Sequence, residues 1–169
     1  VKQKKLIGLV EGLPLHGAAL IGRWQARAAD YPAPLARAMV EHHLRRIFPL
    51  WYHAERLARR DAQLWARQAV VEGAAALLGV LSGLNRGYFS PVQFKRLRRH
   101  VGQFALAPAD LADRLDRLLA AEPASAAAEL EALVRETLAL VGAHLPEADR
   151  AGLAYPPGER EQPWGLVAG

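Results

Sequence analysis

The sequence predicts an all-α domain, built as an up-down bundle of five or six helices. Apolar residues recur at helical spacing along most of the chain, and no segment shows the alternation typical of a strand. Prolines divide the chain into pieces of helix length. Hydrophobic residues make up 51% of the 169 residues, which is enough to fill one core.

Composition narrows the class of protein further. The chain has no cysteine, which excludes a disulfide scaffold and cysteine-ligated zinc. No apolar run reaches the roughly 18–20 residues that span a bilayer, so we expect no membrane partner. The absence of cysteine is compatible with a reducing cytoplasm, which is the location we expect. The net charge is +5, but between Asp110 and Asp149 acids outnumber bases nine to three. The basic character belongs to the first two thirds, and the last third could be its acidic complement.

Residues 1–15 form a short apolar run ending in Gly-Leu-Pro. We interpret this run as an edge strand or linker that enters from a missing N-terminal domain, in keeping with a chain that starts at Val1 rather than Met. A first helix is predicted over residues 17–29, where Leu20, Ile21 and Trp24 share helical spacing. A proline-rich turn follows it.

The next predicted helix covers residues 34–60, and Pro49 should kink or split it because proline removes a backbone donor. A central helix then runs to about residue 86, with Glu72 as the only charge between Val70 and Leu81. Gly79 and Gly83 lie on its small-residue face. Two glycines in a helix cost roughly 1 kcal/mol each relative to alanine, so a close neighbour is expected there. Helix packing is the favoured explanation, and a ligand is the alternative.

A basic helix is predicted to begin at Ser90, with Pro91 at its first position and Gln93 completing a capping box. Its buried stripe should hold four apolar residues: Phe94, Leu97, Val101 and Phe104. Five cations lie in a stretch without any acid between Gly73 and Ala109: Arg86, Lys95, Arg96, Arg98 and Arg99. Such a run is either a solvated helix face or an anion site.

Pro108 should open a fifth helix, and residues 124–145 should form a sixth after Pro123. The bundle domain is therefore predicted over residues 16–150. The remaining segment, residues 151–169, is rich in proline and glycine, and we expect it to be a mobile tail.

Common catalytic motifs are missing from the sequence. It has no glycine-rich phosphate loop, no His-Glu-x-x-His and no Asp-x-Asp pair. Arg37, followed after four residues by His42, matches the loose arginine–histidine motif of helical ribonucleases of the HEPN class. A ribonuclease using these two residues is therefore one hypothesis. Another is a basic adaptor bundle that binds an acidic protein or a nucleic acid backbone.

The segment LNRGYFSP at residues 84–91, followed by Lys95, supports a third hypothesis. It resembles the helical C-terminal domain of polymerase-β-like nucleotidyltransferases, especially the substrate-binding domain of aminoglycoside (kanamycin) adenylyltransferases. The likeness extends over about residues 9–145. By position, the resemblance implies that Asn85, Tyr88 and Lys95 lie near the nucleotide. Charge alone adds Arg86, Arg98 and Arg99 to this predicted nucleotide-binding set.

In that family, catalysis belongs to an N-terminal domain with a Gly-Ser turn and an Asp-x-Asp pair that holds magnesium. Neither element occurs in this sequence. The resemblance therefore implies a substrate- and nucleotide-binding domain with no catalytic residue or cofactor of its own, which should be inactive as a transferase alone. Magnesium and a nucleoside triphosphate would belong to the full protein. The implied partners are the N-terminal catalytic domain, in the same gene or on a separate chain, and a nucleotide or small-molecule acceptor.

Overall fold

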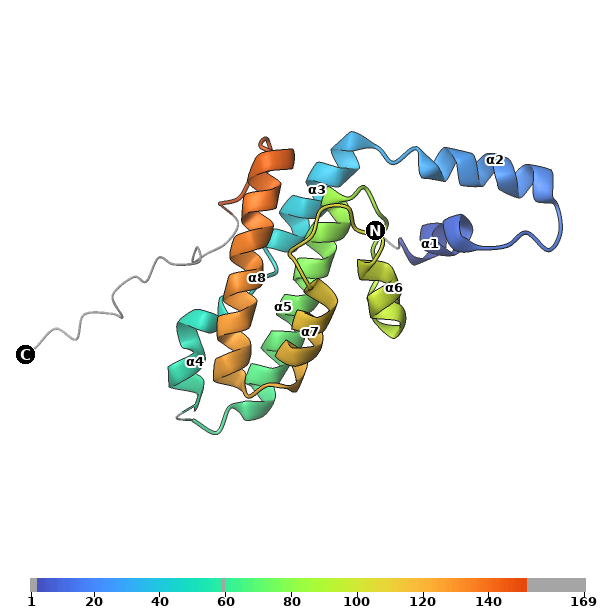
Figure 1. Ribbon diagram of the computed structural model, residues 1–169. Helices are drawn as coiled ribbons and strands as arrows, with labels where there is room; N and C mark the ends of the chain where they lie inside the picture. Colours follow the sequence, from blue (N-terminus) through green and yellow to red (C-terminus); the bar gives the residue numbers. More distant parts are fainter. Residues whose placement is uncertain (1–2, 59, 152–169) are drawn as a thin grey trace, which may run out of the picture.

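The computed structural model describes residues 3–58 and 60–151 (Figure 1). Within these ranges the chain forms eight α-helices and one 3-10 helix and has no strand, which confirms the predicted all-α class. From residue 152 onward the predicted tail lies outside the described residues. The elements are α1 (Lys4–Glu11), α2 (Ala18–Ala29), α3 (Ala33–Leu44), α4 (Leu50–Ala58), α5 (Gln63–Leu84), η1 (Pro91–Arg96), α6 (Leu97–Val101), α7 (Leu111–Ala120) and α8 (Pro123–His144).

Prolines set several helix starts, because their fixed φ suits the first helical turn and their missing N–H is not needed there. Pro34 lies in the first turn of α3, η1 begins at Pro91, and α8 begins at Pro123. The predicted break at Pro49 is also confirmed, since α3 ends at Leu44 and α4 begins immediately after the proline.

The core of the molecule surrounds α5. Helices α3, α5, α7 and α8 run alternately down and up in Figure 1, and α4 packs against α5 and α8 at the lower end. Leu77, Leu78 and Val80 are all buried although they point to different sides of α5. The C-terminal half of the helix is therefore covered nearly all round. The buried side chains that face it include Val40, Leu44, Leu50, Leu115, Leu118, Leu130, Leu133 and Val134.

Three glycines of α5 allow this close packing. A Cβ atom on Gly79 would lie 2.4 Å from the ring of His43, and one on Gly83 would lie 2.9 Å from the Cβ of Met39. On another side of the helix, a Cβ on Gly73 would meet Leu130 of α8 at 2.7 Å. The expectation that a neighbouring helix approaches the central glycines is confirmed, and the neighbour of Gly79 and Gly83 is α3.

Helix α5 is also the one described helix that is long and apolar enough to cross a membrane. However, 61% of its most apolar window is buried inside the bundle. This burial is typical of the core helix of a water-soluble domain, because a membrane-spanning helix directs apolar side chains outward to lipid.

The N-terminal segment differs from its prediction. Of the two predicted alternatives, an edge strand or a linker, the strand is wrong, because residues 4–11 form α1. Helix α1 pairs with α2 as a hairpin that extends from the bundle (Figure 1). This hairpin, residues 4–29, is called the arm. Gln25 of α2 donates its amide N–H groups to the carbonyls of Leu9 (3.0 Å) and Gly12 (2.8 Å), which satisfies acceptors at the end of α1.

The basic helix also differs from its prediction. A 3-10 helix covers Pro91–Arg96 and a short α-helix covers Leu97–Val101, in place of one continuous helix. The Ser90 side chain makes no capping hydrogen bond. Because a 3-10 helix has three residues per turn, it rotates Phe94 away from the stripe, and Phe94 is 38% exposed. Leu97, Val101 and Phe104 do pack against the core.

Ion pairs join the basic and acidic parts of the chain as the charge distribution suggested. Arg98 of α6 pairs with Asp113, at 2.7 Å, and with Asp116 on α7. Arg67 of α5 pairs with Glu122 at 3.2 Å. These ion pairs neutralise part of the excess positive charge. The cations without an acidic partner are therefore the better candidates for binding an anion.

Candidate functional site

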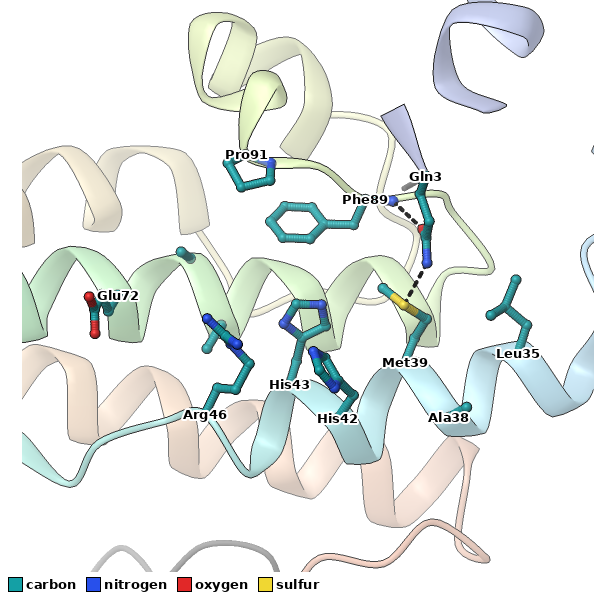
Figure 2. Close-up of a pocket in the computed structure, with 12 residues that line it drawn as sticks. Gln3, Leu35, Ala38, Met39, His42, His43, Arg46, Glu72, Phe89 and Pro91 are labelled. Atoms are coloured by element: carbon teal, nitrogen blue, oxygen red, sulfur yellow. Dashed lines mark hydrogen bonds between the residues drawn. The ribbon is translucent and has the colours of Figure 1, made fainter. Parts of the chain in front are cut away.

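Among the described residues, the chain between Arg86 and Pro91 separates two cavities. The first, called the turn cleft, has a volume of about 350 Å³ and lies between the arm and the end of α5. The second, called the histidine pocket, has a volume of about 430 Å³ and lies between α3, α5 and the 89–91 segment (Figure 2). The turn cleft is lined by Ile7, Val10, Glu11, Ala28, Ala29, Asn85, Arg86, Gly87, Tyr88, His100, Gln103 and Phe104.

Asn85 holds the turn that forms the floor of the turn cleft. Its amide nitrogen donates to the carbonyls of Leu81 and Leu106, both at 2.8 Å. Its amide oxygen accepts from the backbone N–H of Leu106 at 2.9 Å. Both N–H groups and the oxygen are thus engaged by backbone, so Asn85 acts as a positioning residue in this structure.

Arg86 ends α5 in a conformation usual for glycine. Its φ is +53°, in the left-handed region. The N–H of Gly87 donates to the carbonyl of Ser82 at 2.7 Å, and that of Arg86 donates to Gly83 at 3.1 Å, which is the Schellman pattern of a helix end. A non-glycine residue there costs about 1 kcal/mol. The exposed Arg86 side chain forms no ion pair with any described residue.

Tyr88 attaches the arm to the bundle. Its hydroxyl donates to the carbonyl of Ala28 at 2.9 Å, and its ring centroid lies 5.0 Å from that of Tyr31. The Tyr31 hydroxyl is buried without a hydrogen-bond partner. Burial, with a smaller contribution from Tyr88, raises the pKa of Tyr31 to about 12. This aromatic pair fixes one wall of the turn cleft.

The three remaining predicted site residues lie apart from the turn. Arg98 is occupied by its two aspartates, and Lys95 is exposed on η1. Arg99 lines a small cavity beside the turn cleft, together with Glu11, Arg96, His100 and Gln103. Lys95, Arg96 and Arg99 have no ion-pair partner among the described side chains. Of the predicted set, Asn85, Arg86 and Tyr88 line the turn cleft, and Arg99 lies at its edge together with Arg96. Arg98 does not line the cleft and is paired with two aspartates.

His100 was not among the predicted site residues, but it lines both the turn cleft and the small cavity beside it. Its Nε2 lies 3.1 Å from the hydroxyl oxygen of Ser82, which itself donates to the carbonyl of Leu78 at 2.7 Å. Since the hydroxyl proton is used there, the ring nitrogen is the donor. Ser82 is fully buried, so this pair is structural. Burial lowers the pKa of His100, and the nearby Glu11 partly opposes that effect.

The histidine pocket brings together two histidines of α3, an arginine just after α3 and a glutamate of α5 (Figure 2). His42, His43 and Arg46 lie on the α3 side, and Glu72 lies on α5 with Ala75 and Ala76 beside it. The ribonuclease hypothesis considered His42 only together with Arg37, and it did not connect His42 with His43, Arg46 or Glu72. The four-residue spacing of His42 and Arg46 could have indicated that both lie on one side of a helix. The approach of Glu72 could not be predicted, because it depends on how α3 packs on α5.

His43 is half-buried in this pocket. Its ring packs edge-on against Phe89, with centroids 5.4 Å apart, and its Nδ1 is buried without a hydrogen-bond partner. Burial, followed by the charges of His42 and Arg46, lowers the pKa of His43 to about 4. The ring is therefore neutral at physiological pH.

Gln3 closes one end of the histidine pocket and connects it to the arm. Its amide nitrogen donates to the sulfur of Met39 at 2.8 Å, and its amide oxygen accepts from the N–H of Phe89 at 2.8 Å (Figure 2). The residue is buried. The 86–91 segment is thus held by Gln3 on one side and by the Tyr88 contact on the other.

The arginine–histidine pair of the ribonuclease hypothesis is not gathered in one cavity. Arg37 pairs with Glu41, Nε to Oε1 at 2.7 Å, while His42 lines the histidine pocket without Arg37. Among the described residues, no group of three or more histidine, aspartate or glutamate side chains is arranged to hold a metal ion.

No model of a known protein family, no curated protein and no solved structure matches the chain.

Proposed function

We propose that this chain is the helical nucleotide-binding domain of a nucleotidyltransferase and that it binds the nucleotide phosphates at the turn cleft. The observation that carries the proposal is the state of Arg86. It holds a left-handed conformation at a helix end, lines the turn cleft, and has no acid partner in the described part of the chain. An arginine that lines a cavity and has no acid partner is a group that can bind phosphate, because its guanidinium donates charge-assisted hydrogen bonds to phosphate oxygens.

The surroundings of Arg86 suit a nucleotide. Arg96 and Arg99 extend the positive charge along the edge of the cleft, so that a triphosphate meets several cations. Ile7 and Val10 of the arm supply apolar surface on the opposite wall, against which a sugar or base can pack. Glu11, the last residue of α1, is the one acid lining the cleft, and its carboxylate favours hydroxyl or amino groups beside it over phosphate.

The transfer reaction itself is assigned to a separate catalytic domain, in the same gene or on another chain. That domain would carry the Asp-x-Asp pair and its magnesium, and the arm and turn cleft would present the nucleotide to it. Cytoplasmic location follows from this proposal, since nucleoside triphosphates are the substrates.

The test is calorimetric titration of the isolated chain with ATP. We expect weak binding that falls with added salt and that Arg86→Gln and Arg99→Gln each reduce severalfold. Arg98→Gln is the matched control, because the same charge is removed from a residue already held by two aspartates, and it should change affinity little.

Inorganic tripolyphosphate separates this proposal from a basic adaptor surface. A nucleotide site should prefer ATP, since the sugar and base add contacts with the arm. Tripolyphosphate binding equal to that of ATP, or an Arg98→Gln effect as large as that of Arg86→Gln, would contradict the nucleotide site and favour a general polyanion surface.

A further inference from the structure

We propose that the histidine pocket is a second binding site, for a small organic carboxylate with an apolar body. The proposal does not depend on the nucleotide function, because the pocket lies on the other side of the 86–91 segment and shares no lining residue with the turn cleft. Its volume of about 430 Å³ lies in the range of small-molecule sites.

The space arises from small side chains between two helices. Ala75 and Ala76 of α5 and Ala38 of α3 carry only a methyl group where the pocket opens, one turn beyond the close contact at Gly79. Met39 and Phe89 add a sulfur and an aromatic ring to the lining. These walls favour an apolar ligand body of modest size, and the close contact prevents the helices from collapsing to fill the gap.

Arg46 supplies the charge that favours an anion. Five other arginines pair with carboxylates: Arg37, Arg67, Arg98, Arg114 and Arg135. Arg46 has no such partner among the described residues, although Glu72 lines the same pocket. A guanidinium donates two parallel hydrogen bonds to a carboxylate, which gives both energy and orientation. The side chain is exposed at the mouth of the pocket, so an entering ligand meets it first.

His43 supplies a second donor. Its Nδ1 is buried against α5 and lacks a partner, and an unpaired buried N–H is less tolerated than an unpaired lone pair. The proton of the neutral ring is therefore assigned to Nε2, the nitrogen left to reach the cavity. An Nε2–H donor and the Arg46 guanidinium can then share one carboxylate, with His42 beside them.

Glu72 sets the orientation of the ligand. Its carboxylate accepts a hydrogen bond from Gln68, at 2.9 Å, on the same helix. A ligand carboxylate placed near Glu72 would be repelled, so the anion belongs at the Arg46 and His43 side. Removing the charge of Glu72 should therefore strengthen binding of a simple carboxylate, whereas removing that of Arg46 should weaken it.

The experiment is NMR titration of the full chain with benzoate, following the imidazole signals of His42 and His43. Benzamide is the matched probe, because it has the same shape and no charge. We expect benzoate at millimolar concentration to shift both histidines, and benzamide to bind at least about tenfold more weakly. Arg46→Gln should weaken benzoate about tenfold, and Glu72→Gln should strengthen it severalfold.

Arg86→Gln is the control variant, since it alters the turn cleft and should leave benzoate binding unchanged. Three results would overturn the proposal: no shift of either histidine with benzoate, equal binding of benzamide, or unchanged affinity in Arg46→Gln. Arg46 is exposed, so its substitution leaves the core intact and the comparison remains valid. Failure of ATP to bind would not affect this outcome, because ATP is assigned to the other cavity.

Discussion

The ring of His43 lies against the backbone of Gly79. A Cβ atom on Gly79 would clash with three atoms of that ring: Cγ, Nδ1 and Cδ2. This contact joins α3 to α5 at the base of the histidine pocket. It buries the imidazole, lowers its pKa, and sets the helix separation that leaves space one turn away at Ala75 and Ala76.

Gly79→Ala should therefore destabilise the protein by about 2–3 kcal/mol, because the added methyl group meets the ring and the helices must separate. Chemical denaturation monitored by circular dichroism measures the change. Gly22→Ala is the matched control, since a Cβ there meets nothing within 4 Å, and it should stabilise α2 by about 0.5–1 kcal/mol. Equal effects of the two substitutions would contradict the close contact.

The buried imidazoles should make stability fall in mild acid. The folded-state pKa of His43 is about 4, against 6.5 for an unperturbed histidine. Below pH 6.5 the unfolded chain binds a proton that the folded protein does not, so the free energy of unfolding decreases as pH falls towards about 4. The lowered pKa of His100 adds to the same trend.

Denaturation at a series of pH values, together with NMR titration of the His43 ring, tests this prediction. His43→Asn should flatten the dependence between pH 6.5 and 4, and His100→Asn should remove part of the remaining slope. A His43 ring that titrates near its usual pKa in the folded protein would show that the imidazole is not buried as described.

Arg86→Gly should make the domain more stable and less able to bind nucleotide. Glycine adopts the left-handed conformation of the α5 end without strain, so the gain should be about 1 kcal/mol. The same change removes the cation from the turn cleft, and ATP affinity should fall severalfold. Melting temperature and calorimetry on one sample report both effects, and a variant that loses stability would contradict the assigned conformation.

Asn85→Ala should destabilise the protein by about 2–3 kcal/mol, because three hydrogen bonds to Leu81 and Leu106 are lost together. Asn85→Asp keeps the acceptor and loses both donors, so its cost should be at least as large. Urea denaturation gives the values. Loss of ATP binding without loss of stability would instead indicate that Asn85 contacts the nucleotide directly.

The helices of the bundle were predictable because their signals are local. Helical spacing and the flanking prolines place both ends of α2 and α8, and the start of α3, within one residue of where they lie. Residues 4–11 were misread because a short apolar run has no decisive period, and its helix depends on packing against α2 and on Gln25. The 3-10 segment at 91–96 likewise has no clear sequence signal.

The candidate sites were less predictable, because their side chains depend on tertiary contacts. Arg86 and Tyr88 share a cleft since they are neighbours in the chain, but nothing local shows that α7 occupies Arg98. The histidine pocket was missed for the same reason. Arg46 lies just after α3 and Glu72 lies on α5, and the close packing of these two helices brings both residues to one cavity.

The most direct test of the central claim is NMR titration of the wild-type chain with ATP, following the histidine imidazole signals. His100 lines the turn cleft, whereas His42 and His43 line the histidine pocket, so the rings report the two cavities separately. We expect ATP to shift the His100 signal in a saturable manner and to leave the His43 signal unchanged. Shifts at His42 and His43 with none at His100, or no shift at any histidine, would contradict nucleotide binding at the turn cleft.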